Sequence, residues 1–186
     1  NWDGGLSDNA GIYTLGAHPG GTIRGNLVHH VGYYGYGGWG IYPDEGTAGM
    51  LIEDNVVFNT KGASFFTHYG RDNRVRNNIF ALPGQGPVSL GKLEAHRTTV
   101  FERNIVVWRD RPLAGTDWAP GNYRVEGCVF WGDGGNIDFG GGMGLADWQA
   151  AGQFADTVIA DPLLDFVGTP DVCVRAGSPA LALGFK

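Results

Sequence analysis

Two adjacent carboxyl groups end a short apolar segment, in the stretch "GWGIYPDEG" at positions 38–46. A pair of carboxyl groups can act as acid and base when one is protonated and the other is ionised. Asp44 and Glu45 are sequence neighbours, so in a straight strand their side chains point to opposite faces. They can act together only if the turn at Gly46 rotates Glu45 outward.

An aromatic row is predicted beside these acids. The segment before Asp44 has the same form as "AGIYTLG" at 10–16 and "ASFFTHYG" at 63–70. If these segments are stacked strands with Ile12, Ile41, Phe65 and Val88 facing inward, the alternate side chains face outward. The outward set then comprises an exposed aromatic stripe with ionisable groups beside Asp44, namely Tyr13, Tyr42, Phe66, His68 and Tyr69.

Such a stripe suits a carbohydrate. The C–H faces of a sugar ring pack on aromatic rings, and its hydroxyl groups bind carboxylates and other polar side chains. The alternative is that the aromatic rings cover one another and stabilise the sheet.

A second polar group lies in the loop "LEAHRTTVFERN". It brings together Glu94, His96 and Arg97, either as substrate contacts or as a solvated, salt-bridged turn. A zinc site needs three or four converging ligands, and the five histidines show no such spacing. We therefore expect no metal or other cofactor.

A repeated motif indicates which elements hold these side chains. An apolar residue, two mostly polar residues, an asparagine and two apolar residues recur in "IRGNLV", "IEDNVV", "VRNNIF" and "FERNIV". The asparagines are Asn26, Asn55, Asn78 and Asn104, and Cys128 takes the fifth place in "VEGCVF". A period of about 20–30 residues with short strands predicts an all-β solenoid of about five coils. The asparagines would form a ladder that satisfies backbone groups at a turn.

The end of the chain is predicted to cap the stack. The stretch 144–153, "GLADWQAAGQ", favours a short helix, and residues 144–186 as a whole are expected to be the capping region. No matching cover precedes the first coil, so we expect either end-to-end self-association through its exposed strand edge or a disordered first coil.

Composition limits the remaining possibilities. The chain has 186 residues, 33 glycines and a net charge of −6, which fits one glycine-rich domain at 1–186 and argues against a nucleic-acid surface. No apolar run approaches the ~20 residues that span a bilayer. The chain begins without Met or a signal peptide, so we expect a processed form or the distal part of a longer protein. Two cysteines leave one disulfide open.

Several stretches in order, among them "AGIYTLG", "GGWGIYPDEG", "HYGRDNRVRNNIFA", "EAHR", "IADPLLD" and "GSPALALGF", resemble bacterial right-handed parallel β-helix proteins. These are secreted carbohydrate-active enzymes, and the set is similar to the C-terminal half of glycoside hydrolase family 141. The resemblance implies a right-handed parallel β-helix, a secreted, extracellular or periplasmic location, and hydrolysis of glycosidic bonds by two acids.

The resemblance places those acids at Asp8 and Asp44. In straight strands their offset of seven positions would exceed ~20 Å, so the pairing needs the "SDNAG" segment to bend back. Asp8 can instead be a turn residue that bonds its own backbone.

Two other functions remain open. One is a carbohydrate-binding or structural solenoid without catalysis, which is favoured because Phe66 and Thr67 stand where the family has His and Gln. The other is a polysaccharide lyase, which needs a base and a cation, for which only Lys92 and Arg97 lie near the stripe.

Overall fold

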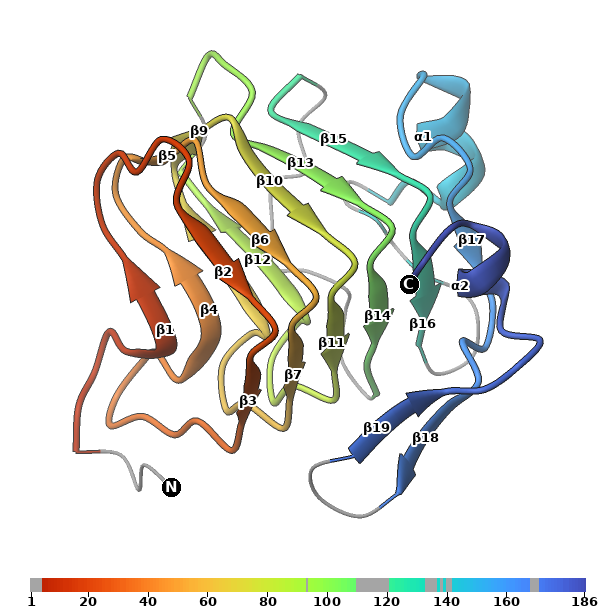
Figure 1. Ribbon diagram of the computed structural model, residues 1–186. Coiled ribbons are helices and arrows are strands. Elements are labelled where there is room, and N and C mark those ends of the chain that lie inside the picture. Colours follow the sequence, from red (N-terminus) through yellow and green to blue (C-terminus); the bar gives the residue numbers. More distant parts are fainter. Residues whose placement is uncertain are drawn as a thin grey trace.

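The protein is built mostly from short parallel strands with two short helices (Figure 1). The computed structural model describes residues 5–92, 94–109, 121–132, 137, 139, 142–167 and 171–186. The predicted all-β class is confirmed.

Three parallel sheets form the body of the molecule (Figure 1). The first contains β1 (Ala10–Thr14), β4 (Trp39–Pro43), β8 (Phe65–His68) and β12 (Val88–Gly91). The second contains β2 (Thr22–Arg24), β6 (Leu51–Glu53), β10 (Asn73–Arg76), β13 (Thr99–Glu102) and β15 (Tyr123–Glu126). The third contains β3 (Leu27–His29), β7 (Val56–Phe58), β11 (Ile79–Ala81), β14 (Ile105–Val107), β16 (Val129–Trp131) and β17 (Val158–Ile159). Each pass of the chain through the sheets is called a repeat below.

A small parallel pair, β5 (Thr47–Ala48) and β9 (Gly70–Arg71), lies between the first and second sheets in chain order. The remaining elements are α1 (Leu145–Ala150), α2 (Pro179–Ala182) and the antiparallel pair β18 (Leu164–Val167) and β19 (Asp171–Val174).

The predicted register of the first sheet is confirmed. Ile12 pairs with Ile41, Ile41 with Phe65, and Phe65 with Val88. The last three of these side chains are fully buried, and Ile12 packs against the same core. The alternate side chains of these strands therefore face outward, where the predicted site lies.

The predicted asparagine ladder is also present. The backbone N–H and the side-chain amide of Asn55 both donate to Oδ1 of Asn78, at 3.0 and 2.9 Å, and Asn55 accepts the same pair of bonds from Asn26. Asn78 donates to Asn104 in the same way. The series continues through Cys128, whose sulfur accepts from the Asn104 N–H at 3.4 Å.

A sixth rung extends this series. The backbone N–H of Cys128 donates to Oγ1 of Thr157 at 3.3 Å. The residue before each ladder position has a positive φ of 48° to 66°, and the set is Gly25, Asp54, Asn77, Arg103, Gly127 and Asp156. One left-handed residue per repeat turns the chain from the second sheet into the third.

The predicted helix at 144–153 is confirmed as α1. Its Trp148 is buried, and Trp148 and Phe154 belong to the same core as Phe130 of the last full repeat. This part of the chain therefore closes the interior at that end.

The last residues of the expected capping region lie elsewhere. Val174, Leu183 and Phe185 pack against Ile79 and Ile105, on the outer face of the third sheet rather than over the end of the stack. The third-sheet strands have apolar residues at their outward positions as well as their inward ones. The apolar side chains of the C-terminal segment cover this outward row and remove it from water.

The first repeat forms one edge of every main sheet, through β1, β2 and β3. The two cysteines are not bridged, since Cys128 is buried and Cys173 is exposed as a free thiol. In the part of the chain that the structure describes, no helix has the length and apolar character needed to cross a membrane.

Candidate functional site

A glycine in β4 sets the outer face of the first sheet. A Cβ on Gly40 would lie 2.2 Å from Cγ1 of Val57 and 2.3 Å from the Ser64 carbonyl oxygen, so Gly40 faces the interior. Ile41, the next residue, is also fully buried. Two successive inward positions leave Trp39 on the outer face, on the same side as Tyr42.

A continuous row of aromatic rings covers this face. Trp39 lies 4.4 Å from Phe66 and 4.5 Å from Tyr42 between ring centroids, and Tyr42 lies 4.7 Å from Phe66. Tyr13 extends the row at 5.1 Å from Tyr42, and Tyr36 extends it at 6.3 Å from Trp39. Sequence analysis missed Trp39 and Tyr36, although the glycine after Trp39 was a usable signal.

The prediction that Tyr42 is exposed is wrong. Only 3 % of Tyr42 is accessible, because the rings of Tyr13, Trp39 and Phe66 surround it. Phe66 is half-buried, and Tyr13 is 46 % exposed. The accessible aromatic surface therefore comes from Tyr13, Tyr36 and parts of Trp39 and Phe66.

Asp44 directly follows β4, beside Tyr13 of this row, and is only 6 % exposed. The Tyr13 hydroxyl donates to Oδ2 of Asp44 at 2.5 Å, and Nδ1 of His68 lies 3.1 Å from Oδ1. The Tyr42 hydroxyl and the Glu45 backbone N–H also bond this carboxyl group. Burial alone raises the pKa of Asp44, but these hydrogen bonds outweigh burial and hold the pKa below its usual value. Asp44 is therefore a carboxylate at neutral pH and has no proton to give.

The same bonds keep the tyrosines protonated. The hydrogen bond to Asp44, followed by burial, raises the pKa of Tyr13 to about 12. Burial and then the bond to Asp44 also raise the pKa of Tyr42. Both phenols are thus hydrogen-bond donors at neutral pH and are poorly suited to act as the base of a lyase.

His68 is held beside Asp44 by its neighbours. Its ring stacks on Phe66 at 6.2 Å and meets the edge of Tyr69 at 5.1 Å. Gly91 pairs with His68 in the next strand, and a Cβ there would be 3.1 Å from the imidazole. The absence of a side chain at Gly91 leaves room for the imidazole ring, so the predicted contact between His68 and Asp44 forms.

Asp8 approaches the aromatic row from the start of β1. Its φ of 51° turns the chain, and its backbone N–H bonds the Tyr36 carbonyl at 3.0 Å. The charge of its carboxylate is the largest cause of a raised pKa of Tyr36, and it also contributes to the raised pKa of Tyr13 and Tyr42. The charges of Asp8 and Asp44 thus both raise the pKa of Tyr13, Tyr36 and Tyr42.

Glu45 is exposed, and the turn at Gly46, with φ of 71°, follows it. Burial and then the Glu45 carboxylate, which accepts a bond from the Tyr69 hydroxyl, raise the pKa of Tyr69. The Glu45 charge also contributes to the raised pKa of Tyr13. The charges of Glu45 and Asp44 therefore affect the same tyrosines, Tyr13 and Tyr69.

The loop with Glu94 and His96 borders this region, whereas Arg97 turns away. Nε2 of His96 lies 3.3 Å from Glu94 and 3.0 Å from the Gly70 carbonyl oxygen. Tyr69, Glu94 and His96 line a cavity of about 190 Å³ together with the turn at Gly46. Arg97 instead approaches Asp72 at 4.0 Å.

Among the described residues, no group of three or more His, Cys, Asp or Glu side chains is arranged to hold a metal ion. Comparison of the chain with protein-family models, curated proteins and solved structures gave no significant match.

Proposed function

We propose that this protein is a glycoside hydrolase that cleaves a glycan lying across the outer face of the first sheet. The observation that carries the proposal is the placement of Asp44. It is a buried, ionised carboxylate at the end of a row of aromatic rings. The charges of Asp8 and Glu45 also raise the pKa of Tyr13, whose hydroxyl bonds Asp44. Glycoside hydrolysis needs one ionised and one protonated carboxyl group beside a surface that holds the sugar ring.

The electrostatics divide the roles among the acids. The low pKa of Asp44 makes it the ionised carboxylate, which either attacks the anomeric carbon or activates a water molecule. The proton donor to the leaving oxygen is then an exposed acid. Asp8 is the first candidate, because its charge raises the pKa of Tyr36 and Tyr42 as well as that of Tyr13. Glu45 is the second candidate, because its charge raises the pKa of Tyr13.

We further propose that the three sheets form a right-handed parallel β-helix. Support comes from the first four repeats, each of which adds one strand to each of the three sheets, and from the six-rung ladder along the stack. The order of motifs that resembles glycoside hydrolase family 141 supports both proposals.

The test compares three variants on two kinds of substrate. Asp8→Asn, Asp44→Asn and Glu45→Gln are assayed on a panel of natural glycans by reducing-sugar release, and on dinitrophenyl glycosides. An activated leaving group needs no proton, so loss of the acid spares the second kind of substrate. We expect Asp44→Asn to lose at least ~100-fold on both, and Asp8→Asn to lose activity on glycans alone.

Glu45→Gln tests the second candidate acid. If it shows the loss on glycans alone and Asp8→Asn does not, Glu45 is the acid. Parental activity of Asp44→Asn on both substrates would refute the assignment of this site.

One observation favours a second candidate, a face that binds glycan without cleaving it. Tyr13 and His68 already occupy one position on each oxygen of the Asp44 carboxylate, and Tyr42 and the Glu45 N–H further lower its pKa. In that case Asp44 only orients Tyr13 and Tyr42. Binding of a glycan by the parent without any cleavage, together with weakened binding in Trp39→Ala, would favour this candidate.

A further inference from the structure

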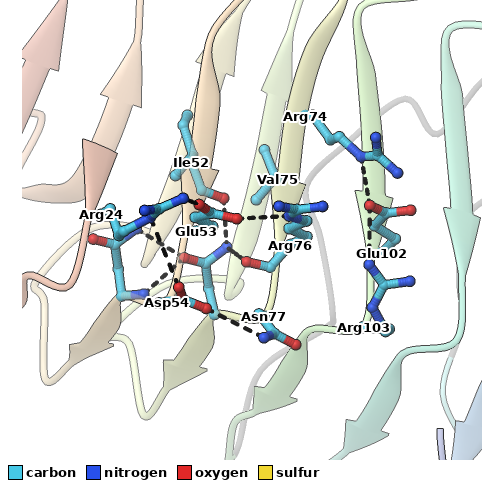
Figure 2. Close-up of polar contacts among 12 residues, drawn as sticks. Arg24, Ile52, Glu53, Asp54, Arg74, Val75, Arg76, Asn77, Glu102 and Arg103 are labelled. Atoms are coloured by element: carbon cyan, nitrogen blue, oxygen red, sulfur yellow. Dashed lines mark hydrogen bonds and ion pairs between the residues drawn. The ribbon is translucent and has the colours of Figure 1, made fainter. Parts of the chain in front are cut away.

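The outer face of the second sheet carries two clusters in which arginines share a buried glutamate (Figure 2). Arg24 and Arg76 flank Glu53 in register across β2, β6 and β10, and Nε of Arg76 lies 2.6 Å from Oε2 of Glu53. Arg74 and Arg103 both bond Glu102, at 2.5 and 3.3 Å.

Both glutamates are buried, whereas their arginine partners are exposed. Glu53 is 3 % exposed and Glu102 is 2 % exposed, whereas the four arginine side chains are 32–58 % exposed. Burial raises the pKa of Glu102, but the bond to Arg74 and the charges of Arg74, Arg103 and Arg76 together outweigh burial and hold the pKa below its usual value. In the first cluster, Glu53 and Asp54, which lies 3.9 Å from Nε of Arg24, balance the charges of Arg24 and Arg76. In the second cluster, Glu102 can neutralise only one of its two guanidinium groups, so one positive charge remains there on a chain of net charge −6.

A groove runs along these arginines. Arg24, Arg76 and Arg103 line a hollow of about 770 Å³, with Leu183 and Lys186 of the C-terminal segment on its other side. Arg103 and Leu183 also line an adjoining hollow of about 640 Å³ beside Asp156. The first hollow, called the groove below, has more basic than acidic side chains, whereas Glu126 and Asp156 make the second one acidic.

The lining indicates the kind of ligand. A guanidinium group binds a carboxylate through two parallel N–H bonds, and arginines two strands apart lie roughly 10 Å apart. Asp54, with a side chain 47 % exposed, also lines the groove and is an acceptor for hydroxyl groups. Asp54 repels a polymer that carries only anionic groups, and Leu183 offers an apolar contact to a sugar ring.

We propose that this groove binds an acidic polysaccharide, a uronate chain that carries a carboxylate and hydroxyl groups on each ring. The groove lies on the second sheet and uses none of the residues of the first-sheet site. Binding here is therefore independent of the proposed hydrolase activity.

The structure offers variants that keep the buried acids paired. Arg103→Gln leaves Glu102 bonded to Arg74, and Arg76→Gln leaves Glu53 bonded to Arg24. Arg175→Gln is the matched control, because it removes the same charge from an arginine that pairs with Asp165 outside the groove.

Titration calorimetry with polygalacturonate tests the proposal, with fully methyl-esterified polygalacturonate as the neutral probe. We expect the acidic polymer to bind at low ionic strength, more weakly at about 0.2 M salt, and its neutral ester not to bind. Arg103→Gln and Arg76→Gln should each weaken binding about tenfold or more, as loss of a charged hydrogen bond implies. Arg175→Gln and Asp44→Asn should bind like the parent.

Any of three results overturns the proposal. They are absence of binding to the acidic polymer, equal binding of the ester, and an equal loss in Arg175→Gln. Melting curves check that each variant is folded, and either groove variant suffices if the other does not fold.

Discussion

At the scale of single residues, Asp44 shows how a buried charge is stabilised at this surface. Burying a carboxylate is costly unless donors replace the lost water. Here two phenols, one imidazole and one backbone N–H supply those donors. The stabilisation depends on the ionised form, so it must vary with pH.

Asp44→Asn is expected to destabilise the fold by about 1–2 kcal/mol at neutral pH, because an amide group is a weaker acceptor for these donors. The folded-state pKa of Asp44 lies below the unfolded value of 3.8. The contribution is therefore present above pH ~4 and is lost as the pH falls through the folded-state pKa. Urea unfolding of parent and variant from pH 7 down to pH 3 measures it.

The control for this prediction is Asp72→Asn. Asp72 has a 58 % exposed side chain in surface ion pairs, so its loss should change the stability by only a few tenths of a kcal/mol at any pH. A parent-to-Asp44→Asn difference that stays constant below pH 4 would contradict the ionised state of Asp44.

Much of this site could be predicted from the sequence. The register that brings Asp44, His68 and Tyr13 together follows from aligning three similar segments. The burial of Tyr42 could not be predicted in this way, because period-two alternation gives the face of a residue but not the rings that cover it. Trp39 was missed for a different reason, because Gly40 breaks the alternation and places Trp39 on the outer face.

At the scale of elements, β4 depends on that glycine. Gly40 lies against Val57 and the Ser64 carbonyl, so close that a Cβ has no room. The break in alternation also places Trp39 between Tyr36 and Tyr42 on the outer face. A single backbone feature thus supports both the core and the aromatic row.

Gly40→Ala is expected to destabilise the protein by about 2–3 kcal/mol, because the added methyl group overlaps the Val57 side chain and the Ser64 carbonyl oxygen. Calorimetric melting measures the effect. Gly5→Ala is the control, since a Cβ there meets no heavy atom within 4 Å. Equal melting temperatures for parent and Gly40→Ala would mean that β4 can shift to accept the methyl group.

The elements differ in how well their sequences predict them. The strands of the second and third sheets follow from one motif, because the ladder residue fixes their register at every repeat. The position of the C-terminal segment was not predictable. Its apolar residues could cover either the end of the stack or an outward apolar face, and only the structure shows Val174 and Phe185 on the third sheet.

At the scale of the whole molecule, the repeats are held together by contacts between neighbours. All pairings in the three main sheets join strands of adjacent repeats in parallel, and each ladder bond joins one repeat to the next. Stability is then a sum of local terms, which differ along the stack when the contacts differ.

The ladder therefore sets how readily each repeat opens to solvent. The backbone N–H groups of Asn55 and Asn78 donate to amide oxygens at 3.0 and 2.9 Å, whereas that of Asn104 donates to a sulfur at 3.4 Å. Sulfur is a weak acceptor. The Cys128 N–H donates to the Thr157 hydroxyl at 3.3 Å, which is also longer than the amide bonds. In hydrogen–deuterium exchange followed by NMR, we expect the amide protons of Asn55 and Asn78 to exchange several-fold more slowly than those of Asn104 and Cys128. Equal rates at all four positions would mean that the molecule opens as one unit; the expected gradient means that it loosens first where the asparagines give way to cysteine.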